Sequence, residues 1–535
     1  CTGSLIDTDG HIVPIAPPDW EAYWRSNKNG RAAGLSGITP DLMILADDEL
    51  GAEYLANINR IIQGDEPPES WKQEVMFPVE KIEGTIKIEK HRPIMLIEVL
   101  RKACTGIIIQ RIRKIWEKHN IISSCNTGFT SNRSTTEPIL KLRMCLDNAR
   151  ATNRSLYLNG EDLSKAFDSP ERAVKELALM RLGVPEKIID FYNKFDEGNQ
   201  VHIITPHGIT TKGEGAQPPF EAECGVKQGT PEGPFIWLAV NDIIWTWVEQ
   251  KSYERVDDGS GYFKESPDSV QHIPLLSFVD DGVYLNTSPA ERQRTLDETS
   301  ALYALIGLDR NGSKCFETAV NGKKQDEPPY MGTWHYKGKL AKTTLKLQAQ
   351  DESGTHTSIP ANTMIWIYQD TENDIIINDA FGKPHKIPKD SQIEMVPNHD
   401  WTIFPKRDTL KKVDDNEAIR QLGVFLNARG TCKDQLRHIT EKTAPELEII
   451  GRKNVHFAEV ELVARAAIEK QATYGLKFTT IREKDIASAM ANTRKTTLNA
   501  AKVCRSDPRD LTGADLAHHG LGLRNWEVVN IANKI

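Results

Sequence analysis

The sequence is poor in cysteine, and the cysteines that it has follow no metal-binding or disulfide-forming pattern. Its 535 residues include eight cysteines, scattered singly, with no CxxC pair and no cysteine–histidine cluster. This pattern argues against a zinc module and against a disulfide scaffold. It favours a reducing, intracellular compartment, which is the cytoplasm or the nucleus. Internal repeats and low-complexity tracts are also absent from the chain.

Long apolar runs are missing as well. No stretch approaches the roughly 18–20 apolar residues that a bilayer-spanning helix needs, so we expect neither an integral membrane protein nor a membrane partner. The composition, 39% hydrophobic and 27% charged, is typical of a soluble globular protein. The length predicts about three domain-sized units.

A strong overall positive charge is lacking, since the formal net charge is −8. The charges are unevenly distributed, however: residues 405–535 contain 23 lysines and arginines against 17 aspartates and glutamates. A basic end behind an acidic body is typical of a protein that grips a polyanion with one part and holds metal with another. A solvated helical face with surplus lysine explains the charge equally well.

Two adjacent aspartates, Asp280 and Asp281, directly follow an apolar run at residues 273–279 (IPLLSFV). This run predicts a buried strand, and residues 283–285 (VYL) predict its returning partner. Asp281-Gly282 predicts the tight turn between them, because glycine accepts the positive φ that such turns need. Two carboxylates there repel each other by about 4 kcal/mol at about 4 Å. Such a pair relaxes by taking up a proton or a divalent cation; an exposed acidic hairpin tip is the alternative.

A third acid, Asp162, ends a second short apolar run that begins at Leu156. If the two strands are neighbours in one sheet, Asp162 meets Asp280 and Asp281. Three converging carboxylates could hold two divalent ions about 3.5–4 Å apart, the arrangement used in phosphoryl transfer.

A loop rich in glycine and proline, residues 225–234 (GVKQGTPEGP), precedes an apolar helical segment at 235–248. Glycine and proline allow the backbone to lie close to a ligand, and Gln228 offers both a donor and an acceptor. An ordinary loop before a helix is the alternative interpretation.

The order of these elements resembles that of the reverse transcriptases, in particular those of non-LTR (LINE-type) retrotransposons. The resemblance is strong over residues 30–320 and looser over 416–535. The fingers-type segments are 34–40 (GLSGITP), 68–71 (PESW), 78–81 (PVEK), 91–96 (HRPIML) with Lys102, and 128–136 (GFTSNRSTT). The later segments resemble motif A at 162–168 (DLSKAFD), B at 225–234, C at 278–281 (FVDD), D at 307–314 (GLDRNGSK) and the primer grip E at 422–424 (LGV).

The resemblance implies catalytic roles for a small set of residues. Asp162 and Asp280 would bind two Mg²⁺ ions, with Asp281 in support and Leu163 in the same metal-binding set; Mn²⁺ is an alternative ion. Oxygen ligands suit such hard cations. Lys314 would protonate the departing pyrophosphate, unless it is an ordinary surface lysine.

The resemblance also implies how a nucleotide is bound. Lys81 and Arg92 would bind the triphosphate, where fixed cations offset developing charge. Phe167 occupies the steric-gate position, where a bulky ring collides with a ribose 2′-hydroxyl, so dNTPs are the expected substrates. Gln228, with Gly229, would position the incoming nucleotide or the templating base. An RNA template and a DNA primer are the expected partners.

The fold that the resemblance implies is an α+β right-hand polymerase with fingers, palm and thumb. The expected fingers are residues 28–155, the palm (an antiparallel sheet plus helices) 156–320, and the primer-grip hairpin with a helical thumb 416–535. Residues 1–27 are expected to be a lead-in or the remnant of an upstream region. Residues 321–415, with short Thr-, Ile- and Tyr-rich runs, predict a β-rich insertion that has no counterpart in the family.

Some residues depart from the family pattern. Phe278 replaces the commoner tyrosine or aromatic–alanine pairing of motif C, and Thr230 and Glu232 replace the frequent aspartate and serine of motif B. Two other functions remain open. One is a catalytically inactive or domesticated RNA-binding protein, against which the three intact aspartates argue. The other is an RNA-templated RNA polymerase, against which Phe167 argues.

Overall fold

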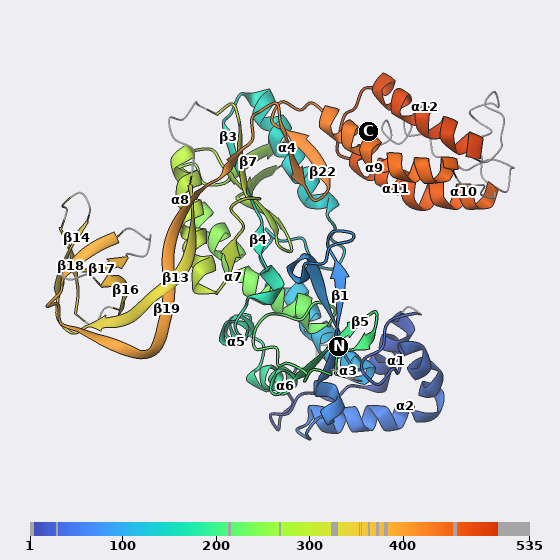
Figure 1. Cartoon of the computed structure of the whole chain (residues 1–535), viewed down its shortest axis with the longest axis horizontal. Helices are drawn as coiled ribbons and strands as arrows, with labels where there is room; N and C mark the ends of the chain where they lie inside the picture. The colour runs from blue at the N-terminus through green and yellow to red at the C-terminus, as the bar shows by residue number, and fades with distance from the viewer. Residues whose placement is uncertain are drawn as a thin grey trace.

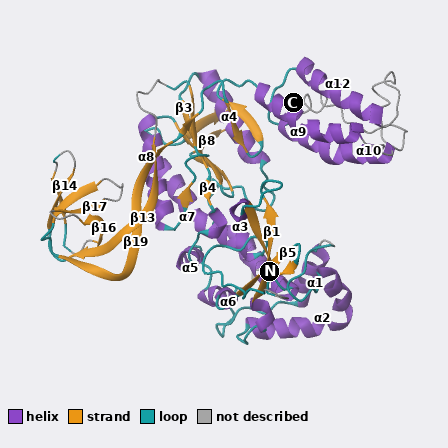
Figure 2. Cartoon of the chain, viewed as in Figure 1, coloured by secondary structure: helices purple, strands orange, loops and turns teal. Residues whose placement is uncertain are grey.

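The computed structural model describes residues 5–27, 30–211, 216–266, 269–322, 330–351, 354, 356–361, 364–370, 374–378, 384–452 and 457–500 (Figure 1). The fold is of the α+β class, with mainly antiparallel strands and many helices (Figure 2). Along the described residues, no helix combines the length and the apolar character that a membrane crossing requires.

The N-terminal part is mainly helical and contains one small sheet. Strand β5 lies parallel to β1, and β2 pairs with β1 on its other side, in the order β2-β1-β5-β6. Helix α3 is buried along much of its length, which makes it the centre of this part. The elements are α1 (Pro17–Ser26), α2 (Pro40–Ile62), η1 (Glu69–Lys72), β1 (Gln73–Glu80), η2 (Ile88–Lys90), β2 (His91–Leu96), α3 (Val99–His119), α4 (Thr136–Thr152), α5 (Arg172–Arg181), α6 (Glu186–Asp196), β5 (Gln200–Thr205) and β6 (Gly208–Ile209).

A five-stranded sheet in the order β20-β12-β3-β10-β9 forms the centre of the molecule. Its residues alternate between two faces, as strand geometry requires. Leu158 and Val283 join a core with α4, whereas Tyr284 joins the core that contains α7 and α8. The elements are β3 (Leu156–Glu161), β4 (Leu163–Ser164), η3 (Ala166–Asp168), α7 (Glu232–Glu254), β7 (Tyr262–Ser266), β8 (Ser269–Ile273), β9 (Leu275–Phe278), β10 (Asp281–Asn286), α8 (Pro289–Leu305), β11 (Asp309–Arg310), β12 (Phe316–Val320) and β20 (Lys411–Lys412).

The expected β-rich insertion is a second sheet that projects from the centre on a long two-stranded ribbon, β13 with β19 (Figure 1). Its seven strands run in the order β15-β14-β18-β17-β16-β13-β19 around a small apolar core that includes Ile367, Ile377 and Ile387. The strands are β13 (Tyr330–Thr343), β14 (Leu347–Asp351), β15 (His356–Ile359), β16 (Met364–Asp370), β17 (Asp374–Asn378), β18 (Pro384–Pro388) and β19 (Ile393–Thr409).

The C-terminal part begins with a hairpin and continues as helices. Strands β21 and β22 are joined at Leu422-Gly423, whose φ angles of 48° and 83° are the positive values that a tight hairpin turn favours. The elements are β21 (Ala418–Gln421), β22 (Val424–Asn427), α9 (Lys433–Arg452), α10 (Phe457–Val463), the π-helical η4 (Ala464–Glu469), α11 (Lys470–Leu476) and α12 (Glu483–Ala500). The part of the expected thumb at 501–535 lies outside the described residues.

Candidate active site

The turn that carries the two adjacent aspartates lies between β9 and β10. Asp281 pairs with Phe278, so Val279 and Asp280 make the two-residue turn. The prediction that Asp281-Gly282 would form this turn is therefore wrong. Val279 takes the left-handed conformation instead, with φ at 65°. For a β-branched residue this conformation is strained, by about 1–3 kcal/mol.

Helix α7 holds the strained turn in place. The carbonyl oxygen of Val279 accepts hydrogen bonds from Trp237 Nε1 at 3.0 Å and from Asn241 Nδ2 at 3.2 Å. Both donors are buried and stand four residues apart, on one face of the helix. The sequence reasoning missed this pair, although a buried asparagine in an apolar helix is the kind of signal that could have found it.

Gly282 has a different role from the predicted one. It lies in β10 opposite Glu161 of β3, and a Cβ atom at this position would be 2.5 Å from Glu161 Oε1. The Glu161 carboxylate is itself fixed by Arg310, which lies 3.0 Å away, and by the Tyr284 hydroxyl. Glycine is therefore needed for close approach of two strands, not for a turn.

The same strand pairing brings the third acid to the turn. Because Glu161 lies opposite Gly282, the next residue, Asp162, emerges beside Asp281 at one end of the sheet. Lys314 Nζ lies 3.0 Å from Asp162 Oδ2 and 3.2 Å from Oδ1. The sequence left it open whether the two strands are neighbours; the structure pairs β3 with β10 and adds an ion pair between two of the predicted residues.

The electrostatics of the turn reflect crowded negative charge. Desolvation by the surrounding chain raises the pKa of Asp280, and the Asp162 carboxylate raises it further, while Lys314 and Arg92 oppose the rise. Desolvation and the charges of Asp280 and Asp162 together raise the pKa of Asp281 to about 6. A divalent cation would relieve this repulsion, as would a proton.

The predicted metal-binding residues share one end of the sheet, but they do not form a closed coordination sphere. Within the described residues, no group of three or more histidine, cysteine, aspartate or glutamate side chains could hold a metal ion as it stands. The Asp162 carboxylate is engaged by Lys314. Leu163 is buried in β4, opposite Arg310 of β11. The donor atoms at the turn are oxygens, the kind that a hard cation prefers.

Phe167 belongs to an aromatic group with Trp237 and Phe129. Its ring stacks on Trp237, with centroids 5.0 Å apart and an interplanar angle of 19°, and meets Phe129 edge-on at 6.5 Å. Trp237 therefore contacts both the ring of the expected steric gate and the turn that carries Asp280. No motif in the sequence indicates this link.

The two basic residues expected to bind a triphosphate lie on the β1–β2 hairpin. Lys81 directly follows β1, and Arg92 in β2 pairs with Val79. Both are exposed. Lys81 acts electrostatically on Asp168, and Arg92 on Asp280, so the hairpin faces the acidic end of the central sheet.

Asp168 interacts with Lys81 and Gln228, two residues predicted to bind the nucleotide. No role was predicted for Asp168 itself. Desolvation raises its pKa, whereas the charges of Lys81 and Lys165 and a hydrogen bond with the Gln228 side chain lower it. The sequence signal that could have indicated Asp168 is its position directly after Phe167, the expected steric gate.

The loop that carries Gln228 and Gly229 is tied to the hairpin through its backbone. Met95 N donates to Gln228 O at 2.6 Å, and a Cβ atom on Gly229 would lie 2.8 Å from Met95 O. Gly229 has a φ of 100°, which favours glycine as well. The loop is thus joined to the hairpin, and Arg92 of the hairpin acts electrostatically on Asp280 of the turn.

A family of known proteins matches the part of the chain that contains this site. Residues 80–335 match the family model described as "Reverse transcriptase (RNA-dependent DNA polymerase)". This span contains Lys81, Phe167, Gln228 and the aspartates at the turn.

Residues 80–335 form a reverse transcriptase domain.

The chain is also similar to Pol polyproteins of retrotransposable elements. The chain is 23% identical over 336 residues to the retrovirus-related Pol polyprotein from type-2 retrotransposable element R2DM of Drosophila melanogaster, covering 61% of this chain and 29% of that protein. It is 23% identical over 296 residues to the type-1 element R2 polyprotein of Nasonia vitripennis, covering 55% and 26%. For the R2 polyprotein of Popillia japonica the identity is 25% over 230 residues, covering 43% and 29%.

The reverse transcriptase chain spans less than a third of the length of each of these relatives. Among solved structures it is similar to apo telomerase from Candida tropicalis, truncated from its C-terminal domain, with a TM-score of 0.35 and 13% identity. That match covers 55% of this chain and 58% of the telomerase chain. The fold is that of a right-hand polymerase, and enzymes with this family's domain generally use divalent metal ions.

Proposed function

We propose that this chain is an RNA-directed DNA polymerase of a non-LTR retroelement, which extends a DNA primer on an RNA template with dNTPs. The observation that carries the proposal is the pairing of β3 with β10, which sets Asp162 beside Asp280 and Asp281 at one end of the central sheet. Phe167 and the basic β1–β2 hairpin face the same region. A scaffold that only bound RNA would have no need to crowd three acids there.

A pair of divalent cations, Mg²⁺ or alternatively Mn²⁺, would bind at the acidic turn. Asp162, Asp280 and Asp281 would hold them, with the Leu163 main-chain carbonyl as a further oxygen donor. When bound, such ions activate the attacking oxygen and stabilise the leaving oxygen of a phosphoryl transfer. The pKa of Asp281, raised to about 6 by burial and by the charges of Asp280 and Asp162, supports this assignment, because a cation would offset those charges.

The remaining predicted residues would bind and orient the nucleotide. Lys81 and Arg92 would bind its triphosphate, since both are exposed and act on the acidic end of the sheet. Phe167, held by Trp237, would exclude a 2′-hydroxyl. Gln228, with Gly229 beside it, would position the incoming nucleotide or the templating base.

Lys314 would have two successive roles. In the absence of a cation its ammonium neutralises Asp162 at 3.0 Å. Once Asp162 no longer holds it, the same ammonium is free to donate a proton to the departing pyrophosphate.

The proposed fingers are residues 28–155, the palm 156–320 and the thumb, with its hairpin, 416–535; residues 321–415 are the inserted sheet and 1–27 a lead-in. The hairpin turn at Leu422 lies next to the helical thumb, because the Tyr474 hydroxyl donates to the Leu422 carbonyl at 3.1 Å. Arg420 in the same hairpin acts electrostatically on Asp281. This placement supports a hairpin that holds a primer end near the acidic turn.

Primer extension with purified protein tests the proposal. A DNA primer on RNA and on DNA templates is offered dNTPs or rNTPs, with Mg²⁺ or Mn²⁺. We expect dNTP incorporation on RNA in wild type and none in Asp280→Asn, whose melting temperature without Mg²⁺ is unchanged or raised because a repulsive charge is lost. Asp257→Asn, which alters an exposed acid away from the turn, is the matched control and should retain activity.

Other outcomes would favour the other functions. Tight RNA binding without incorporation under either metal would indicate an inactive RNA-binding protein. Equal use of rNTPs and dNTPs by wild type would show that Phe167 is no steric gate. If Phe167 is the gate, Phe167→Ala should incorporate rNTPs that wild type rejects.

A further inference from the structure

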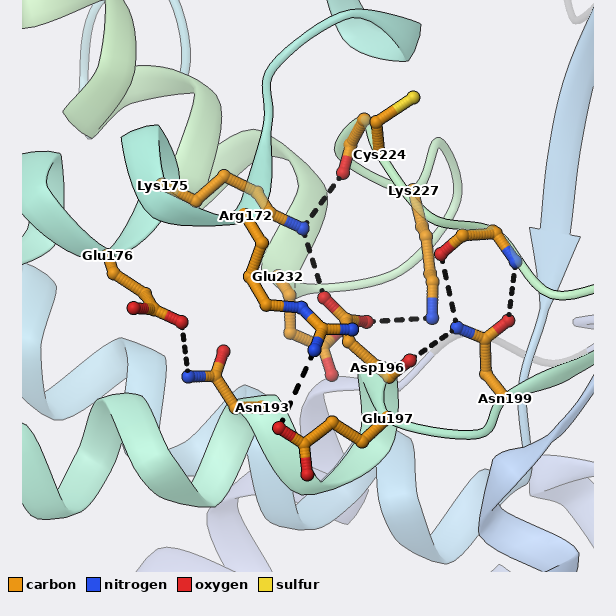
Figure 3. A network of polar contacts seen from close by, with 12 residues as sticks. Arg172, Lys175, Glu176, Asn193, Asp196, Glu197, Asn199, Cys224, Lys227 and Glu232 are labelled. Atoms are coloured by element: carbon orange, nitrogen blue, oxygen red, sulfur yellow. Dashed lines mark hydrogen bonds and ion pairs between the residues drawn. The ribbon is translucent and has the colours of Figure 1, made fainter. Parts of the chain in front are cut away.

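A cluster of buried ion pairs lies behind the loop that carries Gln228. Lys227 Nζ lies 2.8 Å from Asp196 Oδ1 and 2.7 Å from Glu74 Oε1. The other oxygen of Asp196 lies 3.0 Å from Lys175 Nζ. Figure 3 shows Lys175 and Lys227 reaching Asp196 from two sides. One lysine side chain thus bridges two acids that belong to different elements, β1 and α6.

The two acids anchor Lys227 to the nucleotide-binding hairpin and to a helix. Glu74 is fully buried in β1, the strand that leads directly to Lys81. Asp196 is the last residue of α6. Glu74 also pairs with Arg101 at 2.7 Å, so it keeps a cationic partner if Lys227 is replaced. Asp196 likewise keeps Lys175.

The loop itself is fixed on two further sides by its backbone. Val226 N donates to Phe167 O at 2.6 Å, and Met95 N donates to Gln228 O, also at 2.6 Å. Lys227 stands between these two contacts. Its side chain contacts Glu74 of β1 and Asp196 of α6, and therefore fixes the position of the loop relative to these two elements.

We infer that Lys227 is a positioning residue for the nucleotide. It fixes the loop that carries Gln228 relative to β1, so that Gln228 and Lys81 contact the same dNTP. The inference rests on the proposed polymerase function. Lys227 contacts neither the nucleotide nor the three acids at the turn, Asp162, Asp280 and Asp281, and its effect is on nucleotide affinity. Small displacements of a positioning group are enough to cost up to a hundredfold in rate or affinity.

Steady-state kinetics of Lys227→Met test the inference. We expect KM for dNTP to rise about tenfold while kcat changes by less than about threefold, because the binding site is displaced and the catalytic acids are not. The affinity for primer–template, measured by fluorescence anisotropy without nucleotide, should not change. Lys227→Arg retains the positive charge and should restore KM to within about threefold of wild type.

The matched control is Lys194→Met. Lys194 lies on α6, like Asp196, and its Nζ contacts Glu66 at 2.9 Å and the Gly64 carbonyl at 3.5 Å, neither of which belongs to the loop. It should leave KM unchanged. If KM of Lys227→Met equals that of wild type, Lys227 does not position the nucleotide.

Lys227→Met could instead lower primer–template affinity, kcat and melting temperature together. If Lys227→Arg lowers these three quantities equally, the role of Lys227 is structural only and the inference is wrong. If wild type itself incorporates no dNTP, the proposed function fails first, and the inference falls with it.

Discussion

The indole N–H of Trp237 donates a hydrogen bond to the Val279 carbonyl at 3.0 Å, and the same ring stacks on Phe167 at 5.0 Å. Val279 is the left-handed residue of the turn that presents Asp280. A single buried side chain therefore fixes the position of the acidic turn relative to the ring of the proposed steric gate. The strain at Val279 is maintained because its carbonyl has two donors on a rigid helix.

Trp237→Phe removes the donor and keeps most of the ring. We expect it to lower the single-turnover rate of dNTP incorporation at least tenfold, because the turn that carries Asp280 loses one of its two anchors. The folded state should lose about 1–3 kcal/mol, the usual cost of an unmade buried hydrogen bond. Single-turnover kinetics and thermal melting measure the two effects.

The control for this prediction is Trp245→Phe in the same helix. Trp245 is fully buried, and its Nε1 has no hydrogen-bond partner among the described residues. The same substitution there removes no contact to the turn, so the rate should stay near that of wild type. An equal loss of rate in both variants would mean that helix packing, and not the hydrogen bond to Val279, controls activity.

The sequence predicted three of the five strands of the central sheet, β3, β9 and β10, because an apolar run depends on local pattern; β12 and β20 were not predicted. It also predicted that Asp162 lies near Asp280 and Asp281. It placed the turn wrongly, because the need for glycine at Gly282 comes from Glu161 on another strand. Tertiary contacts of this kind leave no local signal.

The links between the predicted residues were also beyond the sequence. The ion pair between Lys314 and Asp162 joins residues 152 positions apart, and the hydrogen bond between Gln228 and Asp168 joins the loop to η3. Both depend on how the loops close over the sheet. The motif residues could be named from the sequence, but their partners in the folded chain could not.

Gly282→Ala should destabilise the protein by about 2 kcal/mol, because its Cβ atom would lie 2.5 Å from Glu161 Oε1 and overpacking in a core costs this much. Urea unfolding followed by fluorescence measures the change. Gly451→Ala, in α9, is the control: its Cβ would meet only Thr496 at 3.4 Å, and alanine favours a helix. If Gly282→Ala is as stable as wild type, the two strands are not held at this spacing.

Arg310→Met should be more damaging, with a loss of about 3–5 kcal/mol, because it leaves a buried carboxylate without its cation. The Glu161 carboxylate would keep only its hydrogen bonds from Tyr284 and Tyr303, at 2.8 and 3.0 Å. Arg294→Met, which breaks only longer contacts of an exposed side chain, should change stability by less than about 1 kcal/mol. Similar urea midpoints for the two variants would show that the buried pair contributes little.

Asp196 should make the protein sensitive to acid. Its burial alone would raise the pKa, but Lys227 and Lys175 outweigh burial and hold the pKa of Asp196 well below its ordinary value of 3.8. A group whose pKa is lower in the folded state stabilises that state above the unfolded pKa and loses this effect as the pH falls. The melting temperature of wild type should therefore drop more steeply than that of Asp196→Asn between about pH 5 and about pH 3.

The control for the acid limb is Asp65→Asn, which removes an exposed pair with Arg60 at 2.9 Å. It should leave the acid-induced drop in melting temperature almost as steep as in wild type. A wild-type slope that Asp196→Asn does not reduce would mean that other carboxyl groups account for the acid limb.

Lys314→Met separates the two roles proposed for this lysine. Without nucleotide, the variant should bind Mg²⁺ about two- to fivefold more tightly, because no ammonium competes for the Asp162 carboxylate; exposed pairs of this kind are worth little more. With nucleotide, the single-turnover rate should fall, because the proton donor for the leaving pyrophosphate is gone. Isothermal titration and rapid quench measure the two effects. Lys411→Met, whose exposed side chain pairs with Glu417 at 3.2 Å, is the control and should change neither. Weaker Mg²⁺ binding by Lys314→Met would show that the lysine assists the metal site and does not occupy its place.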